Sequence, residues 1–237
     1  MEMIKVKNLV KEYENFKLEN FSIDVKEGQL YGILGPNGSG KSTVVKLLTG
    51  QIIPKSGEIK VLGFSPEKEA LELKRNIGII PEQETPPSFL TVKEYLEFVC
   101  KVRNLEKYEE KIEHWLNFLE LKSYENNLIK DLSRGNKQKT LIAQAFLHSP
   151  KLVFIDEPLI NLDPIIQKKI KDFLINYVKE KNTVFLSTHV LSIVKEICSD
   201  VCILKNGRVL LNDSMENVSK SNDNFEDFFI KLIENEK

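Results

Sequence analysis

Several features that would place this chain in other protein classes are scarce or absent. It has only three cysteines in 237 residues, an odd number that forms no disulfide framework and is typical of a reduced compartment. No apolar run approaches the roughly 18 residues that a membrane-spanning helix needs. The longest runs, such as residues 152–155, have the length of strands, and the first residues show no secretory signal pattern. We therefore expect a cytoplasmic protein without a membrane span.

An excess of charge of one sign is also missing. The 34 Lys and Arg residues against 35 Asp and Glu residues leave a net charge of −1. A generic nucleic-acid binder usually carries a basic excess, so no nucleic-acid partner is expected. The 41% hydrophobic content argues against an acidic disordered chain. At about 150 residues per domain, the length predicts one large domain or one domain carrying a smaller one.

Periodicity indicates a chain of mixed α and β structure. Residues 4–7 and 21–25 alternate apolar and polar side chains as half-buried strands do, and residues 30–34 form an apolar run that suits a buried parallel strand. Residues 91–121 have a helical pattern. A second helix is expected from Ser133 to His148.

Strand character returns in the last third. Residues 152–155 and 183–186 are short apolar runs separated by a helical pattern over 165–179, an order that predicts parallel strands joined by a crossover helix. An Asn-Gly pair within residues 201–211 predicts a hairpin. Beyond residue 212, aromatic and aliphatic residues at helical spacing predict a short helix packed on the domain.

A glycine-rich segment carries the strongest chemical signal. It matches G-x-x-x-x-G-K-[ST] between a predicted strand and a predicted helix, the context that this phosphate-binding loop requires. Its glycines let backbone N–H groups converge on phosphate, Lys41 can reach the β- and γ-phosphates, and the Ser42 hydroxyl suits Mg²⁺. The residues expected to contact nucleotide here are Gly35, Pro36, Asn37, Gly38, Ser39, Gly40, Lys41, Ser42 and Thr43. The loop alone does not distinguish a kinase, a GTPase or a mechanical ATPase.

Polar residues at two later strand ends favour hydrolysis. Asp156 ends a predicted strand at the edge where ligands gather in open α/β sheets, and it is suited to hold Mg²⁺. Glu157 is suited to deprotonate a water that attacks the γ-phosphate. His189 follows the next strand and the pair Ser187-Thr188, so it can reach the same crevice. The alternatives are a charged turn and a structural histidine. A guanine-specific Asn-Lys-x-Asp is absent, which argues against a GTPase.

Taken in order along the chain, these motifs resemble those of the ATP-binding cassette proteins, the motor subunits of ABC transporters. The resemblance covers about residues 4–211. Leu132-Ser-Arg-Gly-Asn136 stands where the family has Leu-Ser-Gly-Gly-Gln, and Asp163 belongs to a segment similar to the D-loop. His189 matches the switch histidine, and Tyr13 matches the aromatic residue that stacks on adenine, a role for which a ring face is suited. Alternatively, Tyr13 packs on its own strand.

The Q-loop departs from the family pattern. The family places Gln after Ile-Gly-x-x-Pro, whereas Pro81 is followed here by Glu82 and then Gln83. Either side chain could approach Mg²⁺ or the attacking water. Because an extra carboxylate would add negative charge near the phosphates, Gln83 is favoured for the catalytic and metal role.

The resemblance implies an α/β fold of the P-loop NTPase class. A RecA-like parallel core sheet with an N-terminal antiparallel β region is expected over residues 1–84 and 150–212. A helical signature subdomain is expected over 85–149, and a helical tail over 213–237.

It also implies an ATPase that needs ATP and Mg²⁺. Ser133, Gly135 and Asp163 of one cassette would complete the site of a second cassette, as a homodimer or heterodimer closed by ATP. The motion would drive transport through a separate integral-membrane subunit at the inner face of the membrane. Phe89 or Tyr95 could anchor that partner, or these rings could pack inward. Arg134 and Asn136 resemble exporter-type variants. The alternative function is a soluble ABC-type ATPase acting on nucleic acid or ribosomes.

Overall fold

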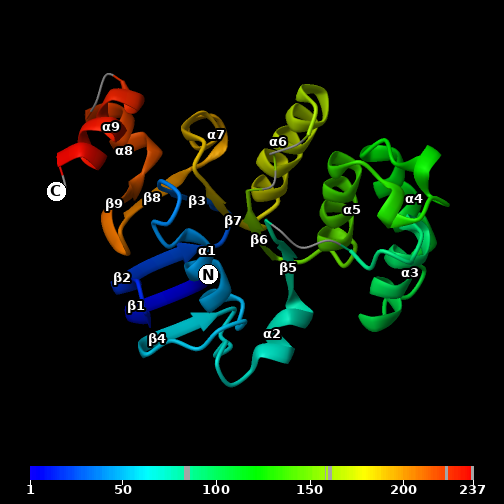
Figure 1. Ribbon diagram of the computed structural model, residues 1–237, viewed down its shortest axis with the longest axis horizontal. Helices are drawn as coiled ribbons and strands as arrows, with labels where there is room; N and C mark the ends of the chain where they lie inside the picture. The colour runs from blue at the N-terminus through cyan, green and yellow to red at the C-terminus, as the bar shows by residue number, and fades with distance from the viewer. Residues whose placement is uncertain (83–85, 158, 160–161, 222–223, 236–237) are drawn as a thin grey trace.

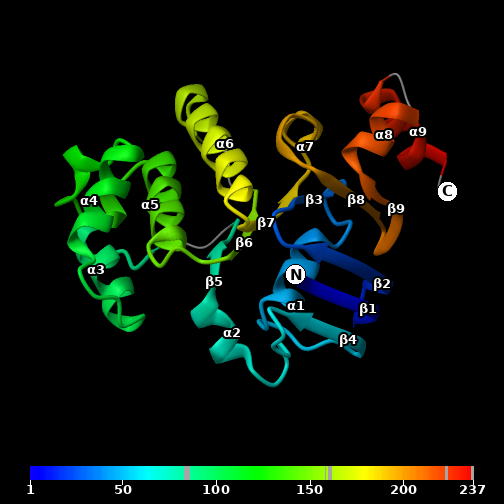
Figure 2. The same cartoon turned by 180° about the vertical axis from the view of Figure 1, so that it is seen from behind.

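The computed structural model describes residues 1–82, 86–157, 159, 162–221 and 224–235. A small sheet lies beside a larger one, and a group of helices lies at the end of the molecule far from the small sheet (Figure 1). The view from behind shows the same separation (Figure 2). Within the described ranges, no helix has both the length and the apolar character needed to cross a membrane.

The small sheet is antiparallel and contains the N-terminus. Its strand order is β2-β1-β4, with β1 (Glu2–Tyr13) paired to both β2 (Phe16–Lys26) and β4 (Ser56–Val61). The predicted segments 4–7 and 21–25 are confirmed as strands, although both strands are longer than predicted. The hairpin between β1 and β2 closes on the pair Tyr13 and Phe16, so two aromatic residues stand at one end of this sheet.

The larger sheet has six strands in the order β5-β6-β7-β3-β8-β9. The strands are β3 (Leu30–Leu34), β5 (Ile77–Ile80), β6 (Leu152–Asp156), β7 (Thr183–Thr188), β8 (Asp200–Lys205) and β9 (Arg208–Ser214). All neighbours are parallel except β8 and β9, which form the predicted hairpin around Asn206 and Gly207, both with positive φ. Because β3, β6 and β7 are parallel neighbours, their carboxyl ends meet at one edge.

Both faces of this sheet are buried. Along β3, Leu30 and Leu34 pack into one hydrophobic cluster and Tyr31 and Ile33 into another. The first cluster includes residues of α5 (Arg134–Phe146), α6 (Pro164–Lys179) and α7 (Leu191–Ile197). The second includes residues of α1 (Lys41–Leu48) and the antiparallel sheet. Burial on two faces explains why these strands read as continuous apolar runs.

The helical group contains two helices where the sequence pattern predicts one. Residues 91–121 form α3 (Val92–Val102) and α4 (Glu109–Phe118), followed by the short 3-10 helices η1 (Lys122–Tyr124) and η2 (Ile129–Asp131). Asn104 and Lys107 adopt positive φ between α3 and α4, a conformation that no α-helix of L-residues continues through. The apolar period is the same on both helices, so periodicity alone does not show the break.

The remaining described helices are α2 (Ala70–Asn76), α8 (Met215–Ser221) and α9 (Phe225–Asn235). Helix α2 packs beside the edge strand β5, and α8 packs beside β8 and β9 at the opposite edge of the larger sheet. In α9, Phe225 is buried, and Phe228 and Leu232 are partly buried against the first cluster. The predicted tail helix is therefore confirmed as a packed element.

Candidate functional site

The glycine-rich loop connects the end of β3 to the start of α1. Gly38 and Gly40 have φ of 80° and 111°, values that side chains with a Cβ rarely adopt. A Cβ at Gly35 would lie 2.1 Å from the carbonyl oxygen of Leu204, so no larger residue fits there. The loop is thus held in one path by backbone contacts, with the positive end of α1 behind it.

Lys41 is folded onto this loop and buried. Its Nζ donates hydrogen bonds to the carbonyl oxygens of Gly35 at 2.8 Å and Pro36 at 3.2 Å. Burial lowers the pKa of Lys41, and the carboxylates of Glu157, Asp156 and Glu82 oppose that shift. An ammonium group held this way lies beside the space where a phosphate would be bound.

Asp156 supplies a buried carboxylate at the end of β6. Its Oδ1 is buried and accepts no hydrogen bond within the described residues. Burial raises the pKa of Asp156, because the charged form is poorly solvated. Asp156, Ser42 and Glu82 line one pocket of about 300 Å³. An unpartnered carboxylate oxygen beside a hydroxyl and a second carboxylate fits a hard cation such as Mg²⁺.

Glu157 is buried and bound by the end of β7. Its Oε2 accepts a hydrogen bond from Thr188 Oγ1 at 2.9 Å, and its Oε1 accepts one from the His189 backbone N–H at 2.8 Å. The His189 Nδ1 lies 2.7 Å from the same Oε1. The pairing of Asp156 with Ser187 brings these residues together. Glu157 directly follows Asp156, and Thr188 and His189 directly follow Ser187.

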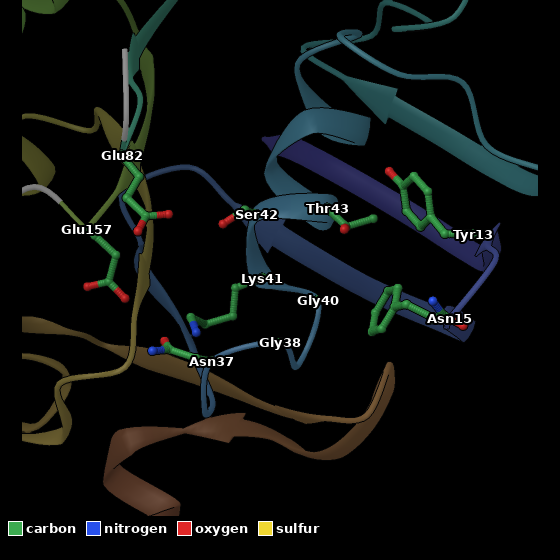
Figure 3. A pocket seen from close by; sticks show the side chains of 11 residues that line it. Tyr13, Asn15, Asn37, Gly38, Gly40, Lys41, Ser42, Thr43, Glu82 and Glu157 are labelled. Atoms are coloured by element: carbon green, nitrogen blue, oxygen red, sulfur yellow. The ribbon is translucent and has the colours of Figure 1, made fainter. Parts of the chain in front are cut away.

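A cavity of about 650 Å³ extends from Glu82 and Glu157 to Tyr13 and Phe16 at the end of the small sheet. Figure 3 shows Glu82 and Glu157 at one side of the loop, Lys41 beside it, and Tyr13 at the other side. Tyr13 is 46% exposed, and its ring centroid lies 6.4 Å from that of Phe16, which also lines the cavity. An exposed ring at the open end of a cavity is available to stack on a flat base.

The predicted nucleotide contacts that line this cavity are Tyr13, Asn37, Gly38, Gly40, Lys41, Ser42 and Thr43. Gly35, Pro36 and Ser39 belong to the glycine-rich loop without lining the cavity. The other three predicted nucleotide contacts stand on other elements. Ser133 caps the N-terminus of α5 by accepting a hydrogen bond from the Asn136 N–H at 3.2 Å, as its residue type predicts, and Gly135 follows in the first turn. Asp163 caps α6 in the same way and lies 4.0 Å from Lys139 of α5. None of the three is among the described residues that line the cavity of the same chain.

The structure describes one of the two Q-loop candidates, and it adds two residues for which no role was predicted. Gln83, the favoured Q-loop residue, lies outside the described residues. Glu82 is described, and it lines both the large cavity and the pocket of Asp156. Sequence reasoning gave no role to Phe16 or Thr188. Two signals for these roles were present in the sequence: Phe16 is an aromatic residue close to Tyr13, and Thr188 belongs to the polar pair directly before His189.

The two aromatic residues after the Q-loop differ in exposure. Phe89 is 82% exposed, whereas Tyr95 is partly buried against the first hydrophobic cluster. Of these two rings, Phe89 is the one whose face is open to a partner.

Known proteins resemble this chain in sequence and in fold. A family model described as ABC transporter matches residues 18–160. The bacitracin transport ATP-binding protein BcrA of Bacillus licheniformis is 35% identical over 95% of this chain and 74% of its own length. A solved structure of the ATP binding subunit of an ABC transporter superposes with a TM-score of 0.91 at 27% identity, covering 97% of this chain and 99% of that one. A dimeric ATP-binding cassette, MJ0796, in a post-hydrolysis state with ADP and Pi has a TM-score of 0.81 at 26% identity, covering 90% and 99%.

Proposed function

Because this chain belongs to the ABC transporter family and is an ATP-binding ABC ATPase, we propose that it powers a transporter by hydrolysing ATP in the cavity beside Lys41. One observation supports this most directly: three charged side chains stand at the edge where the carboxyl ends of β3, β6 and β7 meet. They are the buried Lys41, the hydrogen-bonded Glu157, and Asp156, whose Oδ1 accepts no hydrogen bond from the described residues. Those are the groups that phosphate binding, metal binding and water activation require.

Different residues at this site would bind the phosphates, stack on the base and carry out hydrolysis. The loop from Gly35 to Thr43 holds the phosphates through its backbone N–H groups, and Lys41 exchanges its carbonyl partners for β- and γ-phosphate oxygens. Tyr13 stacks on adenine. Glu157 takes the proton of the attacking water, and His189 binds the γ-phosphate.

Ser42 and Asp156 would hold Mg²⁺, together with Glu82 or Gln83. The buried Asp156 Oδ1, which accepts no hydrogen bond from the part of the chain that the structure describes, supports this assignment. When bound, the cation supplies positive charge that neutralises the phosphate oxygens during transfer.

A second cassette would complete the site. Ser133, Gly135 and Asp163 do not line the cavity of their own chain, yet all three stand at the N-termini of long helices, where anions are favoured. We infer that they face the nucleotide of the partner cassette, so that ATP joins the two chains. The dimeric cassette among the solved structures is consistent with such an assembly.

A separate membrane subunit would receive the motion. We assign residues 1–84 and 150–212 to a nucleotide-binding core, 85–149 to a helical signature subdomain and 213–237 to a helical tail. The exposed ring of Phe89, at the start of that subdomain, is the proposed anchor for the membrane subunit. Binding there would keep the protein at the inner face of the membrane, and the variant signature at Arg134 and Asn136 favours export.

The proposal is tested with Glu157→Gln, which keeps the shape of the side chain and removes its ability to accept a proton. The variant should bind ATP with unchanged affinity, lose hydrolysis and accumulate as an ATP-bound dimer that light scattering detects. Glu58→Gln, on an exposed position of β4, is the control and should behave as wild type. A Glu157→Gln protein that stays monomeric with ATP and turns over normally would overturn the proposal. Co-purification with ribosomes instead of an integral-membrane protein would favour the soluble alternative.

A further inference from the structure

Glu157 has an unusual backbone conformation for a residue at a strand end. Its φ is 51°, in the left-handed region that residues with a Cβ seldom occupy. Its backbone N–H nevertheless donates to the Ser187 carbonyl oxygen at 2.9 Å, so the connection to β7 continues past the last paired residue. The turn at this residue directs the carboxylate toward the end of β7, where Thr188 and His189 bind it.

Thr188 holds this carboxylate with its single hydroxyl proton. The side chain is fully buried, and Oγ1 lies 2.9 Å from Glu157 Oε2. The same Oγ1 accepts a hydrogen bond from the Val190 N–H at 3.1 Å. A hydroxyl has one proton to give and a carboxylate only accepts, so the proton is directed at Glu157. The hydroxyl is thus oriented from both sides.

His189 binds the other carboxylate oxygen but is less constrained. Its side chain is 41% exposed, in contrast to the buried Thr188. A turn of this exposed ring would break the 2.7 Å contact between Nδ1 and Glu157. Two contacts persist when the ring turns, the one from the Thr188 hydroxyl to Oε2 and the one from the His189 backbone N–H to Oε1. Of these two, the one from Thr188 is made by a side chain, and among the described residues it alone holds Oε2.

We propose that Thr188 is a positioning residue for the reaction: its hydroxyl fixes the Glu157 carboxylate in the orientation from which it takes the proton of the attacking water. This inference rests on the proposed role of Glu157 as the base. The placement of a catalytic group by a buried neighbour determines how often the reactive geometry is reached.

Thr188→Val tests the proposal because valine keeps the branched shape and removes the hydroxyl. We expect kcat for ATP hydrolysis to fall about ten- to hundredfold, the factor associated with one hydrogen bond to a charged group, while KM and ATP affinity stay within about twofold. Thr188→Ser restores the hydroxyl and should recover most of kcat. An unchanged kcat in Thr188→Val, or a serine variant as slow as the valine variant, would overturn the inference.

A matched control separates positioning from stability. Thr183 is also fully buried, lies at the opposite end of the same strand, and its hydroxyl accepts a hydrogen bond from the Gly28 N–H at 3.1 Å. Thr183→Val should lower the melting temperature to a similar extent as Thr188→Val and leave kcat unchanged. If both variants lose kcat in parallel with melting temperature, the role of Thr188 is structural and the inference is wrong.

A double variant shows whether Thr188 acts through Glu157. In single-turnover experiments, the Thr188→Val factor should disappear when Glu157 is already glutamine, because there is no base left to position. A full additional loss in the double variant would refute the inference. If Glu157→Gln alone leaves hydrolysis intact, it is the proposed function that fails, so the two failures are distinguishable.

Discussion

Replacing Lys41 by alanine should weaken ATP binding about thirtyfold or more. An ammonium about 4 Å from one charge on each of the β- and γ-phosphates gains about 8 kcal/mol at an effective dielectric constant of about 20. Lys41 first has to leave the carbonyl oxygens of Gly35 and Pro36, which it contacts at 2.8 and 3.2 Å. Each hydrogen bond from a charged group is worth about 1.5–3 kcal/mol, so the two together are worth about 3–6 kcal/mol. The difference, about 2–5 kcal/mol, corresponds to a loss of affinity of about thirtyfold or more.

Isothermal titration calorimetry with ATP and with ADP in the presence of Mg²⁺ measures this loss. Both nucleotides should bind more weakly, since Lys41 is assigned to the β- as well as the γ-phosphate. Lys60→Ala is the control, because Lys60 is exposed on β4 and should leave both affinities unchanged. Melting curves without nucleotide establish that the variants are folded. Undiminished affinity in a folded Lys41→Ala protein, or an equal loss in Lys60→Ala, would refute the reasoning.

Two further predictions concern base stacking and pH. Tyr13→Ala should weaken ATP binding about five- to hundredfold, the range for one base stacked on an aromatic ring, with little change in kcat. Tyr124→Ala, which removes another exposed ring, should have no effect, and a similar loss in both variants would contradict a specific stack. Burial, assisted by the charge of Arg103, lowers the pKa of His148 from 6.5 to about 4. Between pH 6.5 and 4 the unfolded chain therefore binds more protons than the fold, so this residue makes the free energy of unfolding decrease as the pH falls, by on the order of 2–3 kcal/mol. Urea unfolding of His148→Gln at pH 7 and pH 4.5 should show a smaller decrease than wild type. An equal decrease would show that other groups dominate.

Much of the fold could be predicted from the sequence where local patterns are strong. The glycine-rich loop, the apolar run of β3 before it and the helix after it are contiguous, so their order fixes their arrangement. Ser133 was expected to cap a helix because its residue type has that preference, and the Asn-Gly pair at 206–207 was expected to form a hairpin because both positions tolerate positive φ.

Other elements could not be read from local patterns. Strand β5 and helix α2 were not predicted, because four-residue strands and seven-residue helices carry too little periodic signal. The break between α3 and α4 depends on positive φ at Asn104 and Lys107. A polar residue in a helical pattern gives no warning of such a conformation.

The sequence by itself determined the chemistry of this protein: which residues can bind phosphate, hold a cation, accept a proton or stack on a base, and in what order they follow one another. The tertiary structure decided which of these residues meet. Parallel pairing of β6 with β7 brings Glu157 to Thr188 and His189, more than 30 residues later, and the same sheet leaves Ser133 outside the cavity of its own chain. The reason is physical. Residue type and spacing along the chain follow from local covalent structure. Contacts across a sheet depend on register, which is set by the side chains that each face packs into its own hydrophobic cluster.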